Sequence, residues 1–176
     1  MRNVLVVVDT RDLRHCVNII NKEKHLNYGE YINACINPDE EIIYSKLAYG
    51  TCAKQEAMRS FNSLLKLLGF NVVFKEPIEY KASDGSIKQR WISTNVNLAM
   101  DVVEIVNSSN KIDKVVLGCA QPELIPLVEW LKKRGIQVTL FASAVPRALR
   151  EAANKVQDLT DEKYAHLITD NNSKRE

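Results

Sequence analysis

The chain has 176 residues and a formal net charge of +2, from 24 Lys and Arg against 22 Asp and Glu. Its composition, 45% apolar and 26% charged, is that of an ordinary globular protein with one domain, and no apolar run is as long as a membrane span. The N-terminal apolar run is too short for a signal peptide, so we expect a cytoplasmic protein that makes no use of a membrane. The mild charge neither indicates nor excludes a nucleic-acid partner, because binding depends on where basic groups cluster.

The cysteines and histidines give no sign of a zinc site or a thiol catalyst. Cys16, Cys35, Cys52 and Cys119 contain no CxxC pair, and the three histidines complete no zinc pattern. His15 and Cys16 are adjacent and would point to different faces of a helix, which disfavours a Cys-His pair. We expect buried free thiols.

The first half of the chain alternates strand and helix patterns. A buried strand over 3–8 is followed at once by an amphipathic helix over 12–22. After the turn at Asn37-Pro38-Asp39, the pattern predicts a strand over 41–48 and then a helix over 53–68. A third strand is predicted over 71–75.

A hairpin is predicted next. Residues 78–81 and 87–91 are two short extended segments that flank Asp84-Gly85. This dipeptide is a hairpin signal because both of its positions tolerate positive φ. We expect a projecting β-ribbon or an ordered loop here.

The second half continues the alternation. Helices are predicted over 94–106, 122–134 and 146–154, and short strands over 114–118, 136–141 and 156–159. We therefore expect one domain over residues 1–168, followed by a polar, frayed tail over 169–176. The alternation predicts an α/β fold, a three-layer α/β/α sandwich with a mostly parallel central sheet. In such sheets the site lies beyond the carboxyl ends of the strands, where the strand order reverses.

Four acids follow predicted strands or flank that edge. Asp9 comes directly after the first strand and Asp12 follows one turn later, while Asp101 lies beside the apolar stripe of its helix and Glu123 begins another. Each acid also has an ordinary explanation, as a helix cap, a solvated surface group or a first-turn acid favoured by the helix dipole. Gathered together, they would repel one another unless cations were bound, and divalent ions with oxygen ligands are the usual remedy. Two-metal sites of this kind cleave phosphodiesters.

Three segments carry a family resemblance. VLVVVDTRDL (residues 4–13) is similar to an opening strand that ends in Asp, with Asn or sometimes Asp three residues later. TNVNLAMD (94–101) resembles a helix written VDVALALD, and VVLGCAQPELIPLVEWLKKRGIQVTLFA (115–142) resembles VLVSGDGDFVPLVRRLRELGKRVEVVG. These are motifs of NYN domains, the PIN-like ribonuclease group that includes the bacterial LabA-like proteins. The resemblance covers about residues 3 to 160 and implies a PIN-like fold that hydrolyses RNA with Mg²⁺ or Mn²⁺.

The resemblance also implies roles for individual residues. Asp9 and Asp101 match positions of the principal metal ligands, and Asp12 and Glu123 match supporting ligands or water-orienting groups. Asn95 and Gln121 stand where the family usually has Asp. Their amide oxygens can ligate Mg²⁺ weakly, but they carry no charge and cannot act as a general base.

These departures leave several functions open. Four carboxylates can still hold one ion, since Mg²⁺ commonly needs only one or two carboxylates with waters and phosphate oxygens. Alternatively, the domain has lost catalysis and binds RNA or a protein partner. A third alternative is an oligomeric module, such as a homodimer, whose pocket is vestigial; an exposed Trp130 would favour such an interface.

Basic residues and one tryptophan surround the predicted edge. As a group they could hold an RNA backbone and stack a base, although singly each is more often a solvated surface residue. Nothing among them indicates sequence-specific recognition. The candidate RNA contacts are Arg11, Arg14, Lys54, Lys81, Lys88, Arg90 and Trp91.

Overall fold

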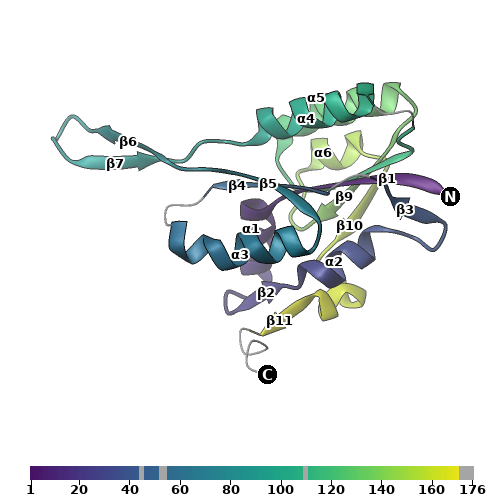
Figure 1. Cartoon of the computed structure of the whole chain (residues 1–176), viewed down its shortest axis with the longest axis horizontal. Coiled ribbons are helices and arrows are strands. Elements are labelled where there is room, and N and C mark those ends of the chain that lie inside the picture. Colours follow the sequence, from purple (N-terminus) through teal and green to yellow (C-terminus); the bar gives the residue numbers. More distant parts are fainter. Residues whose placement is uncertain (44–45, 52–54, 109–110, 171–176) are drawn as a thin grey trace.

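A central sheet organises the molecule (Figure 1). The computed structural model describes residues 1–43, 46–51, 55–108 and 111–170. In these residues, seven strands form one sheet in the order β10-β9-β8-β1-β4-β5, with β3 also paired to β1, and every pairing is parallel. The strands are β1 (Arg2–Asp9), β3 (Glu40–Ile42), β4 (Lys46–Thr51), β5 (Phe70–Lys75), β8 (Lys114–Gly118), β9 (Gln137–Ala142) and β10 (Lys155–Asp158).

Helices cover both faces of this sheet, as Figure 1 shows. One face carries α1 (Thr10–Ile20), α2 (Tyr28–Cys35) and α3 (Gln55–Leu67), and the other carries α4 (Asn95–Ser108), α5 (Ile125–Lys133) and α6 (Arg147–Ala152). The predicted α/β fold with a mostly parallel sheet between two helical layers is therefore confirmed.

The central strands are apolar throughout because both of their faces are covered. Val4 to Val8 of β1 are completely buried, and all five residues of β8 are buried as well. A continuous run of β-branched and aliphatic residues satisfies both helical layers, whereas an alternating pattern would expose polar groups to one of them. The strands predicted over 3–8 and 114–118 are confirmed for this reason.

The strand order reverses beside β1. From β1 the chain moves outwards to β4 and β5, and then it returns to β8 on the other side of β1. The carboxyl ends of β1, β4 and β8 therefore meet at one edge of the sheet, where the connections separate to opposite sides. Such a reversal leaves a crevice at the strand ends.

Some predicted elements have different limits. The strand predicted over 41–48 is two strands, β3 and β4, which pair with the first and last parts of β1 respectively. The helix predicted over 122–134 begins as a 3₁₀ turn, η1 (Pro122–Leu124), before α5. The sequence patterns did not predict β2 (Lys24–Leu26), α2 or the 3₁₀ helix η2 (Glu162–Leu167).

The predicted C-terminal tail starts too early. Thr169 and Asp170 belong to β11 (Ile168–Asp170), which pairs antiparallel with β2. Backbone pairing orders this segment although its side chains are polar, so composition alone misplaced the boundary. The rest of the predicted tail, residues 171–176, lies outside the described residues.

The predicted ribbon is present and stands away from the body of the molecule (Figure 1). It consists of β6 (Ile78–Lys81) and β7 (Ile87–Arg90), which pair antiparallel and are exposed along their whole length. Gly85 closes its turn with a φ of 81°, a conformation that glycine adopts without strain.

Two further expectations concern thiols and membranes. Cys16, Cys35 and Cys119 are buried free thiols, as predicted, and Cys52 lies outside the described residues. Across the described part of the chain, no helix combines the length and the apolar character needed to cross a bilayer.

Candidate active site at the carboxyl edge of the sheet

A pocket of about 450 Å³ opens at the edge where the strand order reverses. The ends of β1 and β4, the start of α1, the segment before α4 and the turn after β8 all contribute to it. Its lining residues are Asp9, Arg11, Asp12, His15, Gly50, Trp91, Ile92, Ser93, Thr94, Asn95, Gln121 and Glu123.

Asp9 is the N-cap of α1 and also lines the pocket. Its Oδ1 accepts hydrogen bonds from the backbone N–H groups of Arg11 and Asp12 at 2.9 and 3.0 Å. Its Oδ2 accepts one from the Thr94 hydroxyl at 3.2 Å. The cap explains why an acid begins this helix. The cap does not explain why the acid also lines a pocket. Asp9 is buried there, with only 8% of the residue exposed.

Asp12 is held by the turn that follows β8. Its Oδ2 accepts a hydrogen bond from the backbone N–H of Ala120, and its Oδ1 accepts one from the Gln121 side-chain amide at 2.7 Å. Gln121 therefore replaces the carboxylate of the family motif with an amide that donates to a neighbouring acid. A second carboxylate at this position would instead repel Asp12.

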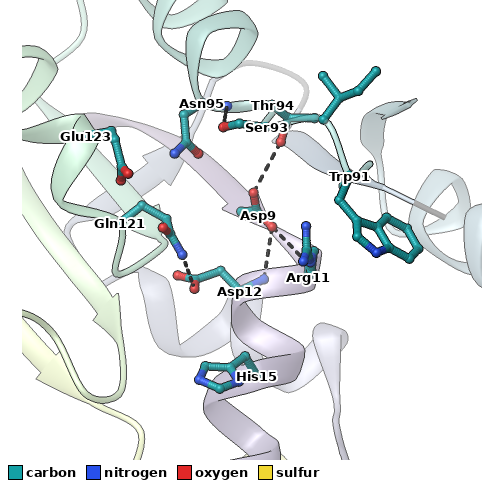
Figure 2. A pocket seen from close by; sticks show the side chains of 12 residues that line it. Asp9, Arg11, Asp12, His15, Trp91, Ser93, Thr94, Asn95, Gln121 and Glu123 are labelled. Carbon is teal, nitrogen blue, oxygen red and sulfur yellow. Dashed lines mark hydrogen bonds between the residues drawn. The ribbon is translucent and has the colours of Figure 1, made fainter. Parts of the chain in front are cut away.

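Glu123 and Asn95 complete the polar side of the pocket. Figure 2 shows Glu123 and Gln121 on one side of the pocket and Trp91 with Arg11 on the other. Glu123 is exposed in the first turn of η1, and Asn95 is buried at the start of α4. Five of the six predicted metal-site residues, the exception being Asp101, therefore line one pocket.

Asp101 has a different position. It does not line the pocket that the described residues form. Its Oδ2 accepts a hydrogen bond of 2.5 Å from the Tyr49 hydroxyl, and Tyr49 is fully buried on β4. The expectation that Asp101 and Asp9 would converge on one spot is not matched by this arrangement.

In the part of the chain that the structure describes, the two buried aspartates have no cationic side chain as a partner. Among the described residues, no ion pair involves Asp9, Asp12 or Glu123. Burial raises the pKa of the Asp9 carboxyl, and the negative charge of Asp12 raises it further, against the hydrogen bonds that Asp9 accepts. A cation in the pocket would oppose both effects.

Thiol chemistry does not fit the site. Burial raises the pKa values of both Cys16 and Cys119, and the nearby Asp12 charge contributes in each case. Because the thiolate is the nucleophilic form, these two cysteines are poor nucleophiles at neutral pH.

The candidate RNA contacts fall into separate groups. Arg11 stacks over Trp91 at the pocket, with 5.2 Å between the guanidinium carbon and the ring centroid. Arg14 lies outside the pocket lining and hydrogen-bonds His25 at 2.9 Å. Lys54 lies outside the described residues.

The ribbon residues divide between its two faces. Lys88 is opposite Tyr80 and Arg90 is opposite Ile78, so these four side chains share one face. Lys81 pairs with Ile87 on the other face. Lys88 and Arg90 can therefore contact the same strand of RNA, whereas Lys81 faces away from them.

Several lining residues were missed by the sequence patterns. His15 follows Asp12 by three residues on α1, a spacing that places both on one helix face and could have identified it. Thr94 was predicted only as the start of a helix, yet its hydroxyl donates a hydrogen bond to Asp9. Gly50 also lines the pocket, and a Cβ there would clash with the Thr10 hydroxyl and the Phe74 ring, a constraint that one sequence cannot reveal.

Trp130, named as a marker of an oligomeric interface, is only partly exposed. The guanidinium of Arg134 lies 3.6 Å from its ring centroid, and the ring packs against the core. The condition set for an interface at this residue, an exposed indole, is therefore not met.

Comparison with known proteins identifies the family. The family model of the NYN domain matches residues 3–160, which is most of the chain, and no curated protein matches. The NYN domain is a PIN-like fold of nuclease type, and its relatives generally act on RNA and use divalent metals. From this match and the parallel three-layer architecture, the chain belongs to the NYN domain family.

Proposed function

We propose that the protein is a divalent-metal-dependent endoribonuclease that hydrolyses RNA phosphodiesters in the pocket at the carboxyl edge of the sheet. One observation supports this most strongly: Asp9 and Asp12 are buried side by side, at 8% and 7% exposure, without a cation side chain among the described residues. Burying a charge without a partner is costly, and sites that tolerate this cost are most often functional.

The donor set fits a hydrated Mg²⁺ or Mn²⁺. Each aspartate already accepts hydrogen bonds, but a carboxylate has about four lone-pair positions, so both can still ligate an ion. Glu123 adds a charged oxygen, and Asn95 and Gln121 add neutral ones. In the described ranges, no three His, Cys, Asp or Glu side chains lie together as a group that could hold a metal ion, so at most two of the acids would ligate it at once. Water and phosphate oxygens would therefore supply the remaining ligands, as is usual for Mg²⁺.

The ion, when bound, would activate water and neutralise charge on the scissile phosphate. The protein's own groups hold and orient the acids that would bind the ion. Two backbone N–H groups and Thr94 fix Asp9, and the turn after β8 fixes Asp12. Glu123 is the exposed acid and is available to accept a hydrogen bond from the attacking water.

RNA would approach along the ribbon. Lys88 and Arg90 neutralise phosphates on one ribbon face, and Trp91 stacks a base beside the pocket. Trp91 is 43% exposed, so part of its ring is free to do so. Arg11 covers the indole and adds a positive charge opposite the acids.

A labelled single-stranded RNA, incubated with Mg²⁺ or Mn²⁺, tests this function. We expect wild-type protein to cut it, and Asp9→Asn and Asp12→Asn to lose at least about 100-fold in rate, the scale of removing a principal electrostatic contribution. Glu129→Gln, an exposed acid on α5, is the matched control and should cut normally. Wild-type protein that never cuts, with either metal, would refute the proposal.

A second function is supported by a specific observation. Gln121 stands where the family usually has an acid, and its side-chain amide donates a hydrogen bond to Asp12. The site therefore offers less negative charge to a metal. An RNA-binding domain without catalysis would retain RNA affinity in wild type and in Asp9→Asn alike, with no cleavage in either.

A further inference from the structure

We propose that Asp101 is a positioning residue, which acts through Tyr49 to hold α4 against the sheet, and that it is not a ligand of the metal ion. This inference rests on the metal site of the proposed function. It concerns the acid that the family resemblance placed among the principal ligands.

The first observation is the place of Asp101. Its carboxylate accepts a 2.5 Å hydrogen bond from the Tyr49 hydroxyl, and the pocket lining does not include it. Tyr49 is the strand partner of Asp9, and partner positions on neighbouring strands point to the same face of a sheet. The long phenol extends beyond the short Asp9 side chain and meets α4 at a different point.

The second observation is that α4 is attached to the sheet at several points. Thr94, directly before the helix, donates to Asp9, while Asp101 lies nearly two turns further along. Between them, Lys75 of β5 donates to the Asn97 side chain at 2.6 Å. Contacts at both ends of this stretch fix the position and the rotation of the helix.

The chemistry of the contact favours a permanent attachment. Burial raises the pKa of Tyr49, and the hydrogen bond to Asp101 raises it further, so the phenol keeps its proton and remains a donor. A hydroxyl donating to a carboxylate is among the stronger protein hydrogen bonds. A metal that displaced this hydrogen bond would leave a completely buried phenol without its acceptor.

The attachment has a consequence for the pocket. Thr94, directly before α4, and Asn95, the first residue of that helix, form the pocket wall next to Asp9. If Asp101 releases Tyr49, the helix can shift and carry both residues away from Asp9. Asp101 would thus influence metal affinity without touching the metal.

Mn²⁺ binding, measured by the electron paramagnetic resonance of free Mn²⁺, distinguishes the two roles. A positioning role predicts that Tyr49→Phe and Asp101→Ala each weaken binding by about 10-fold, the scale for outer groups of a metal site, and that the double variant is no worse. Asp101→Asn keeps an acceptor for Tyr49 and should remain within about twofold of wild type. Asp9→Asn is the comparison for loss of a true ligand.

A ligand role predicts the reverse pattern. Asp101→Asn would then weaken Mn²⁺ binding as much as Asp9→Asn does, and Tyr49→Phe would leave binding unchanged or tighten it by freeing the acid. Either result overturns the inference.

Wild-type protein that binds no Mn²⁺ would overturn the proposed function instead. Thermal unfolding then tests, without any metal, whether the contact between Tyr49 and Asp101 stabilises the protein. Equal losses of melting temperature in Tyr49→Phe, in Asp101→Ala and in their double variant support the attachment, and additive or absent losses overturn it.

Discussion

The two edges of the sheet both bury acids, but among the described residues an acid is paired with a cationic side chain at the amino edge and not at the carboxyl edge. At the amino edge, Glu40 is 4% exposed and lies 2.6 Å from the ammonium of Lys114, which also donates to the Cys35 carbonyl at 3.0 Å. At the carboxyl edge, Asp9 and Asp12 are buried to a similar degree without such a partner among the described residues.

The pKa shifts follow this difference. Burial acts to raise the pKa of Glu40, but hydrogen bonds from Lys114 and the Asn37 backbone outweigh it and lower the pKa below its usual 4.5. For Asp9, burial and the charge of Asp12 prevail and the pKa is raised above 3.8. A buried acid paired with a protein cation has a structural role, whereas the buried acids at the carboxyl edge support the cation site that we propose there.

The largest expected effect is at the amino edge. Lys114→Met removes the nearer cation from buried Glu40 and leaves it the partly exposed Arg2 at 3.5 Å, so the free energy of unfolding should fall by up to about 3–5 kcal/mol, the cost of an uncompensated buried charge. Denaturant unfolding measures this. The double variant Lys114→Met with Glu40→Leu should recover much of the loss, because a buried pair can be replaced by apolar groups. A loss below about 1 kcal/mol in the single variant would mean that the pair does not stabilise the fold.

The same pair predicts an acid limit to stability. Because the folded-state pKa of Glu40 is lowered, its contribution is present above the unfolded value of 4.5 and is lost as pH falls through the lower folded value. Wild type should therefore lose stability faster than Lys114→Met below that pH. Parallel pH profiles for the two proteins would contradict this.

An added acid at the carboxyl edge should have the next largest effect. Gln121→Asp removes the hydrogen bond to Asp12 and places a third carboxylate beside it, so metal-free protein should lose about 1–3 kcal/mol. Added Mn²⁺ should then stabilise the Gln121→Asp variant by more than it stabilises the wild-type protein. Asn71→Asp, at an exposed position on β5, is the control and should change little.

Removing an acid from that edge should act in the opposite direction. Asp9→Asn keeps a good N-cap and relieves a buried charge, so metal-free protein should gain about 0.5–2 kcal/mol. Because the folded-state pKa of Asp9 is raised, its ionisation costs nothing below pH 3.8, the cost grows as pH rises through the folded value, and it is complete above that value. The gain should thus appear at neutral pH and vanish in acid, as measured by unfolding at both. An equal gain at both pH values would point to another cause.

The smallest effect concerns RNA. Replacing Lys88 and Arg90 together by Gln should weaken binding several-fold and reduce the slope of log affinity against log salt by about 1.4, from two phosphate contacts at about 0.7 each. Fluorescence anisotropy with a single-stranded RNA measures both. The control replaces Lys133 and Lys155, exposed basic residues away from the ribbon. An unchanged slope in the ribbon variant would remove the ribbon from the RNA-binding surface.

The sequence predicted the core of the fold well and its peripheral segments poorly. The runs Val4–Val8 and Val115–Leu117 are apolar because both faces are buried, a requirement that is visible in one chain. The segments β2 and β11 are short, partly polar and ordered by pairing with each other across the chain. Local patterns carry no information about such a distant partner, so Thr169 was placed in the tail.

The site was predicted in part for a similar reason. Asp9, Asp12 and Glu123 follow strands or begin helices, so the parallel topology alone places them at one edge. Asp101 matches a family position, but its contact depends on Tyr49, 52 residues earlier in the chain. The direction of a side chain on a helix is set by such partners, which the spacing of one sequence does not contain.

The most direct test of the contrast between the edges is thermal unfolding of wild type and Asp9→Asn with and without Mn²⁺. A cation that completes the carboxyl edge should raise the wild-type melting temperature as its concentration passes the dissociation constant, and should raise that of Asp9→Asn much less. Glu129→Gln should respond as wild type does. A Mn²⁺ response that is absent from wild type, or undiminished in Asp9→Asn, would contradict the proposal that Asp9 and Asp12 bind a divalent cation.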